Sequence, residues 1–194
     1  MDAATLAYVF WHAPLPSVEL AEYERGLGAF HASLAGAPPK GFRGSASYRA
    51  SRAPWEGSGL GAAVYVDWYV VEGWAALGEL EDAAVAPAHR PAHDGIARFA
   101  DRAYGGLYRL RRGAVDLPAV RFDGWVGKPR GVPSEAFADG LLLPGSPPGT
   151  SVWQRQLALG PAPEFCRRSV HAPPALVDGE RRVEVRPVAV PPRG

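Results

Sequence analysis

The stretch FHASLAGAPPKGFRG, residues 30 to 44, places a histidine in the last turn of a predicted helix, shortly before a Pro-Pro break. Because an imidazole titrates near working pH, His31 could serve as a general base or as a hydrogen-bond partner at the mouth of a cavity. In the alternative, structural interpretation, its ring caps the last carbonyl groups and, when charged, meets the negative end of the helix. The choice depends on what the helix packs against.

Two predicted strands, residues 5–12 and 61–71, carry side chains of different character on their two faces, because strand residues point alternately to opposite sides. One face carries aromatic rings, an imidazole and a carboxylate: Tyr8, Phe10, His12, Tyr65, Asp67 and Tyr69. The other face carries Ala7, Val9, Trp11, Val64, Val66 and Trp68. We expect the valine-rich face to pack against helices and the tyrosine face to line a partly polar lumen.

Asp67 is a carboxylate in mid-strand among aromatic residues, and such a group needs a partner when it is buried. The partners that the sequence offers are His12, Arg43, Arg49 and Arg155. Asp67 is then either part of an ion pair that holds the sheet or a carboxylate of raised pKa that acts as acid or base. The candidate proton-handling residues are His31, His12, Asp67 and Tyr8, and the candidate ligand contacts are Phe10, Tyr65, Tyr69, Arg43, Trp125 and Gln154.

Other short motifs favour structural roles. In APAHRPAHDG, His89 and His93 are four residues apart beside Asp94, a spacing that suits zinc on a helix. Pro91 removes an amide between them and no HExxH motif is present, so we expect a polar loop bordering the cavity and no metal. The run GSGLGA precedes a strand rather than a helix and does not indicate a phosphate loop. Cys166, within EFCRRS, is expected to be a packed thiol.

The composition indicates a globular chain without a nucleic-acid partner. Hydrophobic residues make up 47% and charged residues 21% of the 194 residues, and the formal net charge is +1. The charges are interspersed, so no basic surface is predicted. A single cysteine fits a reducing compartment. The first apolar run has no basic segment before it and no run reaches membrane-spanning length, so we expect a cytoplasmic protein without a membrane partner.

The periodicities predict strand 5–12, a helix from an N-cap at Ser17 to residue 35, strands 41–51 and 61–71, helical patterns from 73 and over 93–103, and strand 105–112. This β-α-β-β-α-β order is ferredoxin-like: an α+β fold, with an antiparallel sheet and helices on one face. The runs 119–128, 134–142, 150–160, 163–170 and 181–190 repeat the order with reduced helices. We therefore divide the chain into repeats 1–113 and 119–190 and a tail, 191–194.

Two such repeats can cover the exposed faces of each other's sheets. A four-stranded sheet with helices on one face leaves its other face exposed to water until another element packs on it. Two sheets packed face to face would form an intrachain barrel with a cavity between them, lined in the second repeat by Asp123, Trp125, Gln154 and Gln156. Two isolated four-stranded sheets are the alternative.

The frame ELAEYERGLGAFHASLAGAPPKGFRG resembles the EthD-like branch of the dimeric α+β barrel superfamily, in which a first helix ends in a His-Ala-x-Leu-type segment. AAVYVDWYVVEGWAALGEL is similar to the third strand and second helix of that group. The resemblance covers mainly residues 5–112. The family usually has Pro after the His-Ala pair, where Ser33 stands here, and its chains are commonly half as long and pair with a second copy.

The predicted aromatic-lined cavity suits a small hydrophobic or aromatic ligand. The resemblance implies cofactor-independent chemistry on such a ligand: oxygenation, cyclisation, decarboxylation or isomerisation. The resemblance strengthens the interpretation of His31 as a site residue. It implies a monomer with an internal pseudo-dimer or a homodimer. Two alternatives belong to other classes: a non-catalytic ligand-binding or assembly protein, and a haem protein in which His31 or His12 ligates iron.

Overall fold

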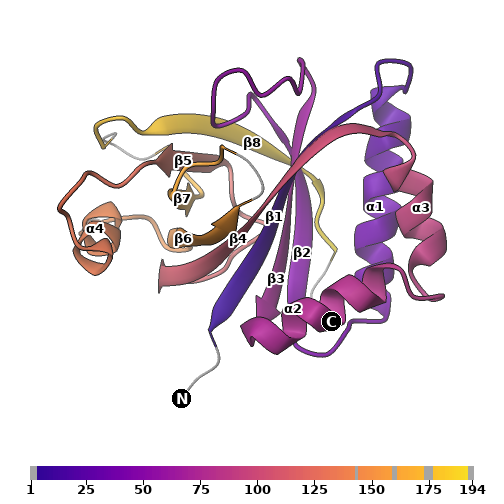
Figure 1. The fold of residues 1–194 in the computed structure, drawn as a ribbon, viewed down its shortest axis with the longest axis horizontal. Helices are drawn as coiled ribbons and strands as arrows, with labels where there is room; N and C mark the ends of the chain where they lie inside the picture. Colours follow the sequence, from indigo (N-terminus) through magenta and orange to yellow (C-terminus); the bar gives the residue numbers. More distant parts are fainter. Residues whose placement is uncertain (1–3, 143, 159–160, 173–176, 192–194) are drawn as a thin grey trace.

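The computed structural model describes residues 4–142, 144–158, 161–172 and 177–191, and within them eight strands close into an antiparallel barrel with four helices on its outside (Figure 1). In chain order the elements are β1 (Thr5–Pro14), α1 (Leu20–Gly36), β2 (Phe42–Ala50), β3 (Val64–Glu72), α2 (Gly73–Ala84), α3 (Arg90–Ala97), β4 (Ala100–Gly113), β5 (Phe122–Val126), α4 (Ser134–Leu141), β6 (Ser151–Ala158), β7 (Phe165–Ser169) and β8 (Arg181–Ala189). The predicted α+β class is confirmed.

The strand order around the barrel is β1-β3-β2-β8-β5-β7-β6-β4. The first four strands are ordered β4-β1-β3-β2, and the last four repeat this order as β8-β5-β7-β6. The two groups join where β2 pairs with β8 and β4 pairs with β6. The barrel closes within one chain, so its closure requires no second copy. The repeated order supports our proposal of repeats 1–113 and 119–190; of the predicted tail, residues 192–194 lie outside the described residues.

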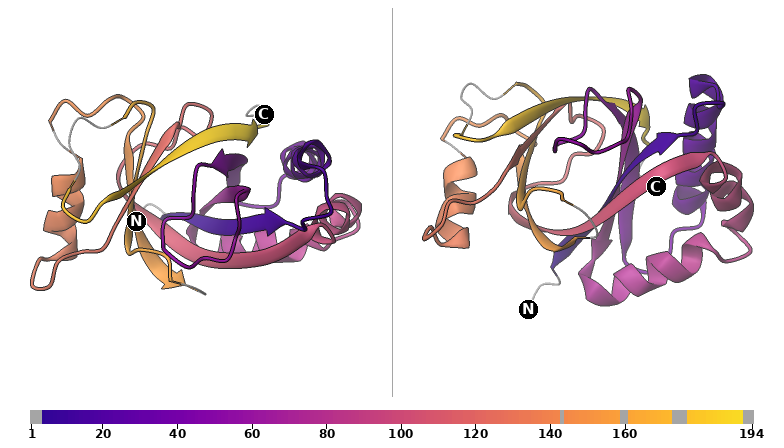
Figure 2. Two further views of the ribbon diagram at one scale, coloured as in Figure 1. Left: turned by 90° about the horizontal axis from the view of Figure 1, so that it is seen from above. Right: turned by 45° about the horizontal axis from the view of Figure 1, so that its top comes forward.

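Helices α1, α2 and α3 lie together on the outer face of the first four strands, and α4 lies outside the second group (Figures 1 and 2). The buried residues of α1 are Tyr23, Leu27, Phe30, His31 and Leu34. The three- and four-residue spacing puts them on one face, which packs on the sheet. The helix begins at Leu20 with Glu19 as its N-cap residue, rather than at the predicted Ser17.

Tryptophans fill the interior of the barrel. Trp11 and Trp125 come from opposite groups of strands and their ring centroids lie 5.2 Å apart. Trp68 and Trp153 meet across the barrel in the same way at 5.3 Å. All four are fully buried, and the surrounding cluster contains Ala7, Val9, Tyr48, Val64, Val66, Tyr108, Cys166 and Val183. Close-packed rings of this size act as a core, not as the wall of a chamber.

The predicted assignment of the two strand faces is therefore wrong. The valine-rich face of β1 and β3, with Trp11 and Trp68, points into the barrel. The tyrosine face, with Tyr65 and Tyr69, points outward and packs with Leu27 of α1. The alternation itself was predicted correctly, but alternation separates two sets of side chains without saying which set faces helices. The inter-sheet cavity predicted from that assignment is occupied by the tryptophan core.

One predicted element is also replaced by two. The helical pattern over 93–103 is helix α3 only as far as Ala97, and strand β4 begins at Ala100. Pro91 lies in the first turn of α3, where a missing amide costs no hydrogen bond. The loop expected around His89 and His93 is thus the start of a short helix that packs on α1.

Candidate active site

A buried carboxylate lies under helix α1 at the centre of a polar network. Asp67 stands in β3, the strand between β1 and β2, and is paired in register with Phe10 and Ser47. Its Oδ2 accepts a hydrogen bond from the Tyr69 hydroxyl at 2.9 Å. Its Oδ1 lies 3.2 Å from His12 Nε2 and its Oδ2 lies 3.6 Å from His31 Nε2. Both are electrostatic contacts, because neither Nε2 meets hydrogen-bond geometry with the carboxylate.

The other nitrogen of each imidazole contacts a hydroxyl group. His12 Nδ1 lies 2.6 Å from the hydroxyl of Tyr23, and His31 Nδ1 lies 2.7 Å from Ser45 Oγ. With Nε2 facing a carboxylate in both rings, the consistent tautomer carries its proton on Nε2 and accepts at Nδ1 from the hydroxyl. The network then runs as two arms, Tyr23–His12–Asp67 and Ser45–His31–Asp67, that share one carboxylate.

The network is buried and its electrostatics are mutually supporting. Burial by itself would raise the pKa of Asp67, but the neighbouring His12 and His31 outweigh it and hold that pKa below its usual range. Burial, followed by the charge of Asp67, raises the pKa of Tyr69 and of Tyr23, so both hydroxyls remain donors. Asp67 is therefore a fixed anion among donors, and the raised pKa considered for it from the sequence is wrong.

The structure does not place His31 as a helix cap. Its ring is completely buried and stacks on Tyr69, with centroids 5.1 Å apart and planes at 8°. At the end of α1 the amide of Ala37 donates to the carbonyl of Ser33. Residues on one helix face turn toward the sheet together, and His31 follows Phe30 at the edge of that face. The His31 side chain therefore reaches Ser45 and Asp67 rather than the end of its helix.

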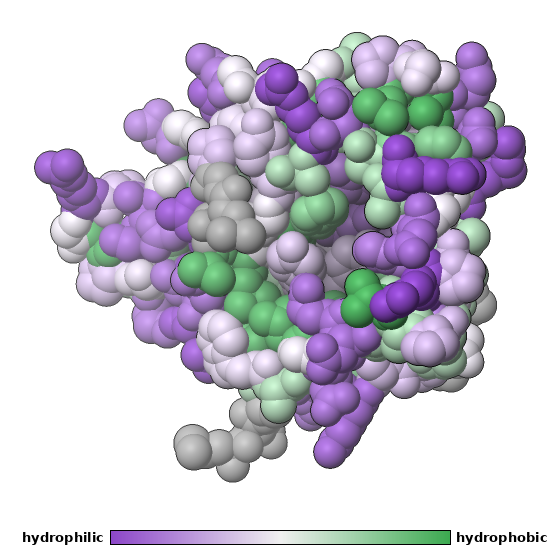
Figure 3. All heavy atoms as spheres, turned by 45° about the vertical axis from the view of Figure 1, so that its right-hand side comes forward, coloured by the Kyte–Doolittle hydropathy of each residue, from purple (hydrophilic) through white to green (hydrophobic). Residues whose placement is uncertain are grey.

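Beside this network a pocket of about 200 Å³ opens on the outer face of the barrel. Its walls are mostly aromatic or aliphatic, and we call it the tyrosine pocket; its lining residues are Tyr8, Phe10, Phe30, Tyr69, Leu80, Glu81, Ala84 and His93. Tyr69 belongs both to the pocket and to the network, because its hydroxyl donates to Asp67. Figure 3 shows the side of the molecule that carries the helices, with hydrophilic and hydrophobic residues around a hollow.

Besides the Glu81 carboxylate and the Tyr69 hydroxyl, two polar groups line the tyrosine pocket and can act as base and acid on a ligand. His93 Nδ1 lies 2.9 Å from Asp94 Oδ1, so Nε2 is the ring nitrogen left to meet a ligand. Its ring packs edge-on against Phe30 with centroids 5.5 Å apart. Burial, and then Glu81, raises the pKa of Tyr8, which keeps its hydroxyl a donor. An imidazole oriented by a carboxylate beside a neutral phenol is a base and an acid in one apolar pocket.

The structure separates the predicted site residues into three groups. His12, His31 and Asp67 form the network, and Tyr8, Phe10 and Tyr69 line the pocket next to it. Tyr65 stacks on His12 and donates to Glu24 at 3.1 Å, so it is part of the packing under α1. The remaining predicted ligand contacts, Arg43, Trp125 and Gln154, lie elsewhere.

Those three residues have other partners. Arg43 forms an exposed ion pair with Glu72. Trp125 is in the barrel core, as expected for a lumen residue, although no ligand space surrounds it there. Gln154 donates to Glu164 at 3.2 Å, because its neighbour Trp153 takes the inward position on β6. Asp123 faces inward as expected and pairs with Arg168 at 2.8 Å.

Sequence reasoning missed Ser45 and His93 as site residues. Ser45 stands on the same outward face of β2 as Asp67 on β3, and its strand register pairs it with Tyr69. His93 was expected only to border a cavity. The signal for Ser45 was available: a small polar residue on a strand of which the alternate positions, Ala46 and Tyr48, are core.

Neither metal nor haem fits the described residues. Among them, no group of three or more His, Cys, Asp or Glu side chains is arranged to hold a metal ion. His12 and His31 direct both ring nitrogens at protein groups. The tyrosine pocket, at about 200 Å³, is smaller than a porphyrin requires. Within the part of the chain that the structure describes, no helix is long and apolar enough to cross a membrane.

No protein-family model matches the chain, and no curated protein matches it. Among solved structures, a candidate monooxygenase from Fusobacterium nucleatum is similar over 100% of this chain and 97% of its own, with a TM-score of 0.66 and 10% sequence identity. A candidate monooxygenase from Lactobacillus acidophilus is similar over 98% of this chain and 97% of its own, with a TM-score of 0.56 and 12% identity. At these identities the similarity establishes the fold alone.

Proposed function

We propose that the protein binds a small aromatic or hydrophobic molecule in the tyrosine pocket and removes a proton from it. The observation that carries this proposal is the pairing, in one apolar pocket, of the His93–Asp94 couple with the hydroxyl of Tyr8. His93 takes the proton at Nε2, and Asp94 stabilises the imidazolium that results. Tyr8 donates a hydrogen bond to the oxygen on which negative charge develops.

The buried network supports this site without touching the ligand. Asp67 fixes the hydroxyl of Tyr69, and the stacked ring of His31 fixes its plane. Because Tyr69 donates to Asp67, its oxygen is left to accept a hydrogen bond from a hydroxyl group of the ligand. His12, His31 and Asp67 are thus proposed as positioning residues. A pocket of about 200 Å³ has room for a molecule of one or two rings.

Oxygenation is the step that we propose to follow proton removal. The EthD-like resemblance of residues 5–112 implies cofactor-independent chemistry, and two proteins of this fold are candidate monooxygenases. A carbanion formed beside a carbonyl reacts with O₂, and a CH₂ group becomes C=O with release of one water, so that both oxygen atoms are accounted for. The presence of only one cysteine in the sequence is in keeping with a cytoplasmic location.

The test is hydrogen exchange of β-tetralone in D₂O, followed by NMR. This two-ring ketone has benzylic hydrogens made acidic by the ring and the carbonyl, so the readout reports proton removal whatever step follows. We expect exchange faster than in buffer. The H93N variant should lower the rate by at least about a hundredfold, the size of a lost general base. Y8F should lower it by between about tenfold and a hundredfold.

His171, exposed on the second half of the chain, provides the matched control. The H171N variant removes one imidazole and should leave the rate unchanged, which excludes catalysis by surface histidines. If the wild-type protein binds α-naphthol but exchanges the hydrogens of β-tetralone no faster than buffer does, the alternative of a non-catalytic ligand-binding protein replaces the proposal. If wild type and H93N exchange at the same rate, His93 is not the base.

A further inference from the structure

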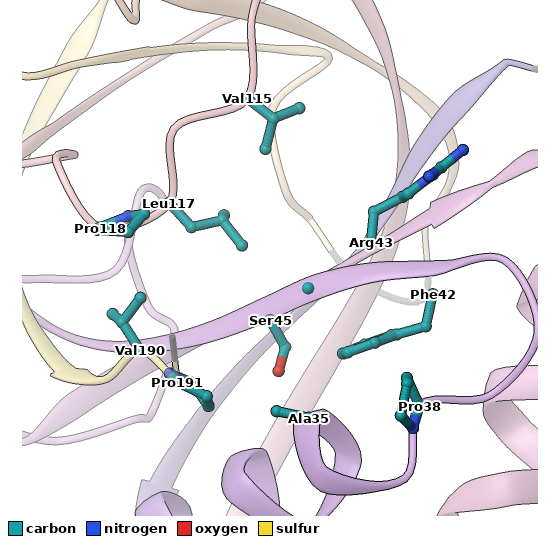
Figure 4. Close-up of a pocket in the computed structure, with 11 residues that line it drawn as sticks. Ala35, Pro38, Phe42, Arg43, Ser45, Val115, Leu117, Pro118, Val190 and Pro191 are labelled. Carbon is teal, nitrogen blue, oxygen red and sulfur yellow. The ribbon is translucent and has the colours of Figure 1, made fainter. Parts of the chain in front are cut away.

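A second pocket, of about 330 Å³, is lined in part by Ser45 of the buried network. We call it the serine pocket (Figure 4). It forms where the end of α1, the start of β2, the connection between the two groups of strands and the end of β8 meet. Its lining is Ala35, Pro38, Phe42, Arg43, Gly44, Ser45, Val115, Leu117, Pro118, Val190 and Pro191.

Ser45 is the hydroxyl-bearing residue of an otherwise largely apolar lining. In Figure 4 its Oγ points from β2 toward Ala35 of α1, between the walls formed by Phe42 and Pro191. It is 5% exposed. A β-bulge interrupts the pairing of β2 with β3 between Phe42 and Gly44, directly before it. Bulges beside a functional residue commonly re-aim a side chain.

The hydroxyl of Ser45 contacts an imidazole, and that imidazole faces a carboxylate. Its Oγ lies 2.7 Å from Nδ1 of His31, within the range for transfer of its proton to the imidazole. On the other side of the ring, Nε2 of His31 lies 3.6 Å from the buried carboxylate of Asp67. That separation is loose, as is common in nucleophile–base couples without a ligand.

We propose that Ser45 is a nucleophile that accepts acyl groups from activated esters bound in the serine pocket, with His31 as its base and Asp67 as the positioning residue. Ser45 Oγ forms a bond to the acyl carbon while its proton passes to His31 Nδ1. The bond from that carbon to the leaving oxygen breaks, and the leaving group takes the proton from His31. Water then releases the acid by the same route. The apolar lining selects a short aliphatic acyl chain.

This site is separate from the proposed proton-removing site, which uses His93 and Tyr8 at the tyrosine pocket. The two share only the buried network. A fluorophosphonate with a butyl chain traps an activated serine without needing turnover. We expect one adduct per chain, measured by intact mass, and peptide mapping should place it on Ser45. Mapping on the wild type answers the question even if variants fold poorly.

Ser47 supplies a matched control, because it is a buried serine two residues along the same face of β2, and its Oγ has no hydrogen-bond partner among the described residues. S47A should be labelled as wild type is. S45A should not be labelled, and H31N should be labelled about a hundredfold more slowly. Hydrolysis of p-nitrophenyl butyrate should follow the same order.

An adduct mapped elsewhere, the absence of any adduct, or equal labelling of S45A and wild type overturns the proposal. Equal labelling rates of H31N and wild type overturn the role of His31. None of these outcomes bears on the exchange of β-tetralone, because that assay tests His93 and Tyr8. Failure of one proposal is therefore distinguishable from failure of the other.

Discussion

Replacing Asp67 with Asn tests whether the network under α1 is held by a charged carboxylate. The change keeps size and shape but removes the charge and turns one acceptor oxygen into an NH₂ group. Asp67 faces Tyr69 at 2.9 Å, His12 at 3.2 Å and His31 at 3.6 Å, all with donors. In D67N at least one of these buried donors meets another donor. A buried donor without an acceptor costs about 1–3 kcal/mol.

We therefore expect D67N to lose about 1–3 kcal/mol of unfolding free energy at neutral pH. For a chain of this length each kcal/mol corresponds to roughly 2–4 °C, so the melting temperature should fall by roughly 2–12 °C. Urea unfolding followed by circular dichroism gives the free energy, and calorimetry gives the melting temperature. Asp101, an exposed aspartate, is the control, and D101N should change stability by less than about 0.5 kcal/mol.

The pH dependence gives a second readout with a definite sign. The pKa of Asp67 is lowered in the folded state, so its stabilisation is fully present above the unfolded value near 4 and is lost as pH falls below it. D67N has no such contribution. The stability gap between wild type and D67N should therefore narrow as pH drops below about 4. A gap below about 1 kcal/mol at neutral pH, or one that widens in acid, would refute the charged-carboxylate reasoning.

Three further predictions concern the frame that positions the site. G28A should raise stability by up to about 1 kcal/mol, because Gly28 is in α1 and a Cβ there meets no atom within 4 Å; a loss of stability would show strain in the helix. G113A should lower the unfolding free energy by several kcal/mol, because Gly113 has a φ of +80° and a Cβ there would lie 2.0 Å from a backbone oxygen. The control G131A, at a φ of +82° with no atom near the added Cβ, should lower it by only about 1–2 kcal/mol. Equal melting temperatures of the two variants would contradict this. R168M should lower the unfolding free energy by about 3–5 kcal/mol, because it leaves Asp123 buried without its partner. Adding D123N to R168M should restore part of that free energy, and no restoration in urea unfolding would contradict a stabilising ion pair.

Much of the fold could be predicted from the sequence because its signals are local. The aromatic and β-branched runs gave strands β1, β3 and β8 within a few residues, and Pro-Pro after Gly36 ended α1 as expected. The boundary between α3 and β4 was missed because both a helical and an extended pattern fit residues 98–103. The strand forms because β4 pairs with β1 along residues Leu6 to Pro14 of β1.

The orientation of the sheet could not be read from alternation. It follows from long-range packing: the barrel interior needs large apolar side chains, and Trp11 and Trp68 share a face with the valines. The polar face needs hydrogen-bond partners, and α1 supplies them through Tyr23, which contacts His12, and through His31, which contacts Ser45. A histidine within an apolar helix stripe was in fact the signal that the sheet face beneath it is polar.

The position of a bound aromatic molecule decides whether the tyrosine pocket or the barrel interior is the binding site. We expect a crystal structure of the protein with α-naphthol to show the rings between Tyr8 and Phe30, on the outer face of the barrel, with the hydroxyl within hydrogen-bond distance of Tyr8, Tyr69 or His93. The tryptophan core should be unchanged. Naphthol in the barrel interior among Trp11, Trp68 and Trp125, or an empty tyrosine pocket in a crystal that holds naphthol elsewhere, would contradict the account.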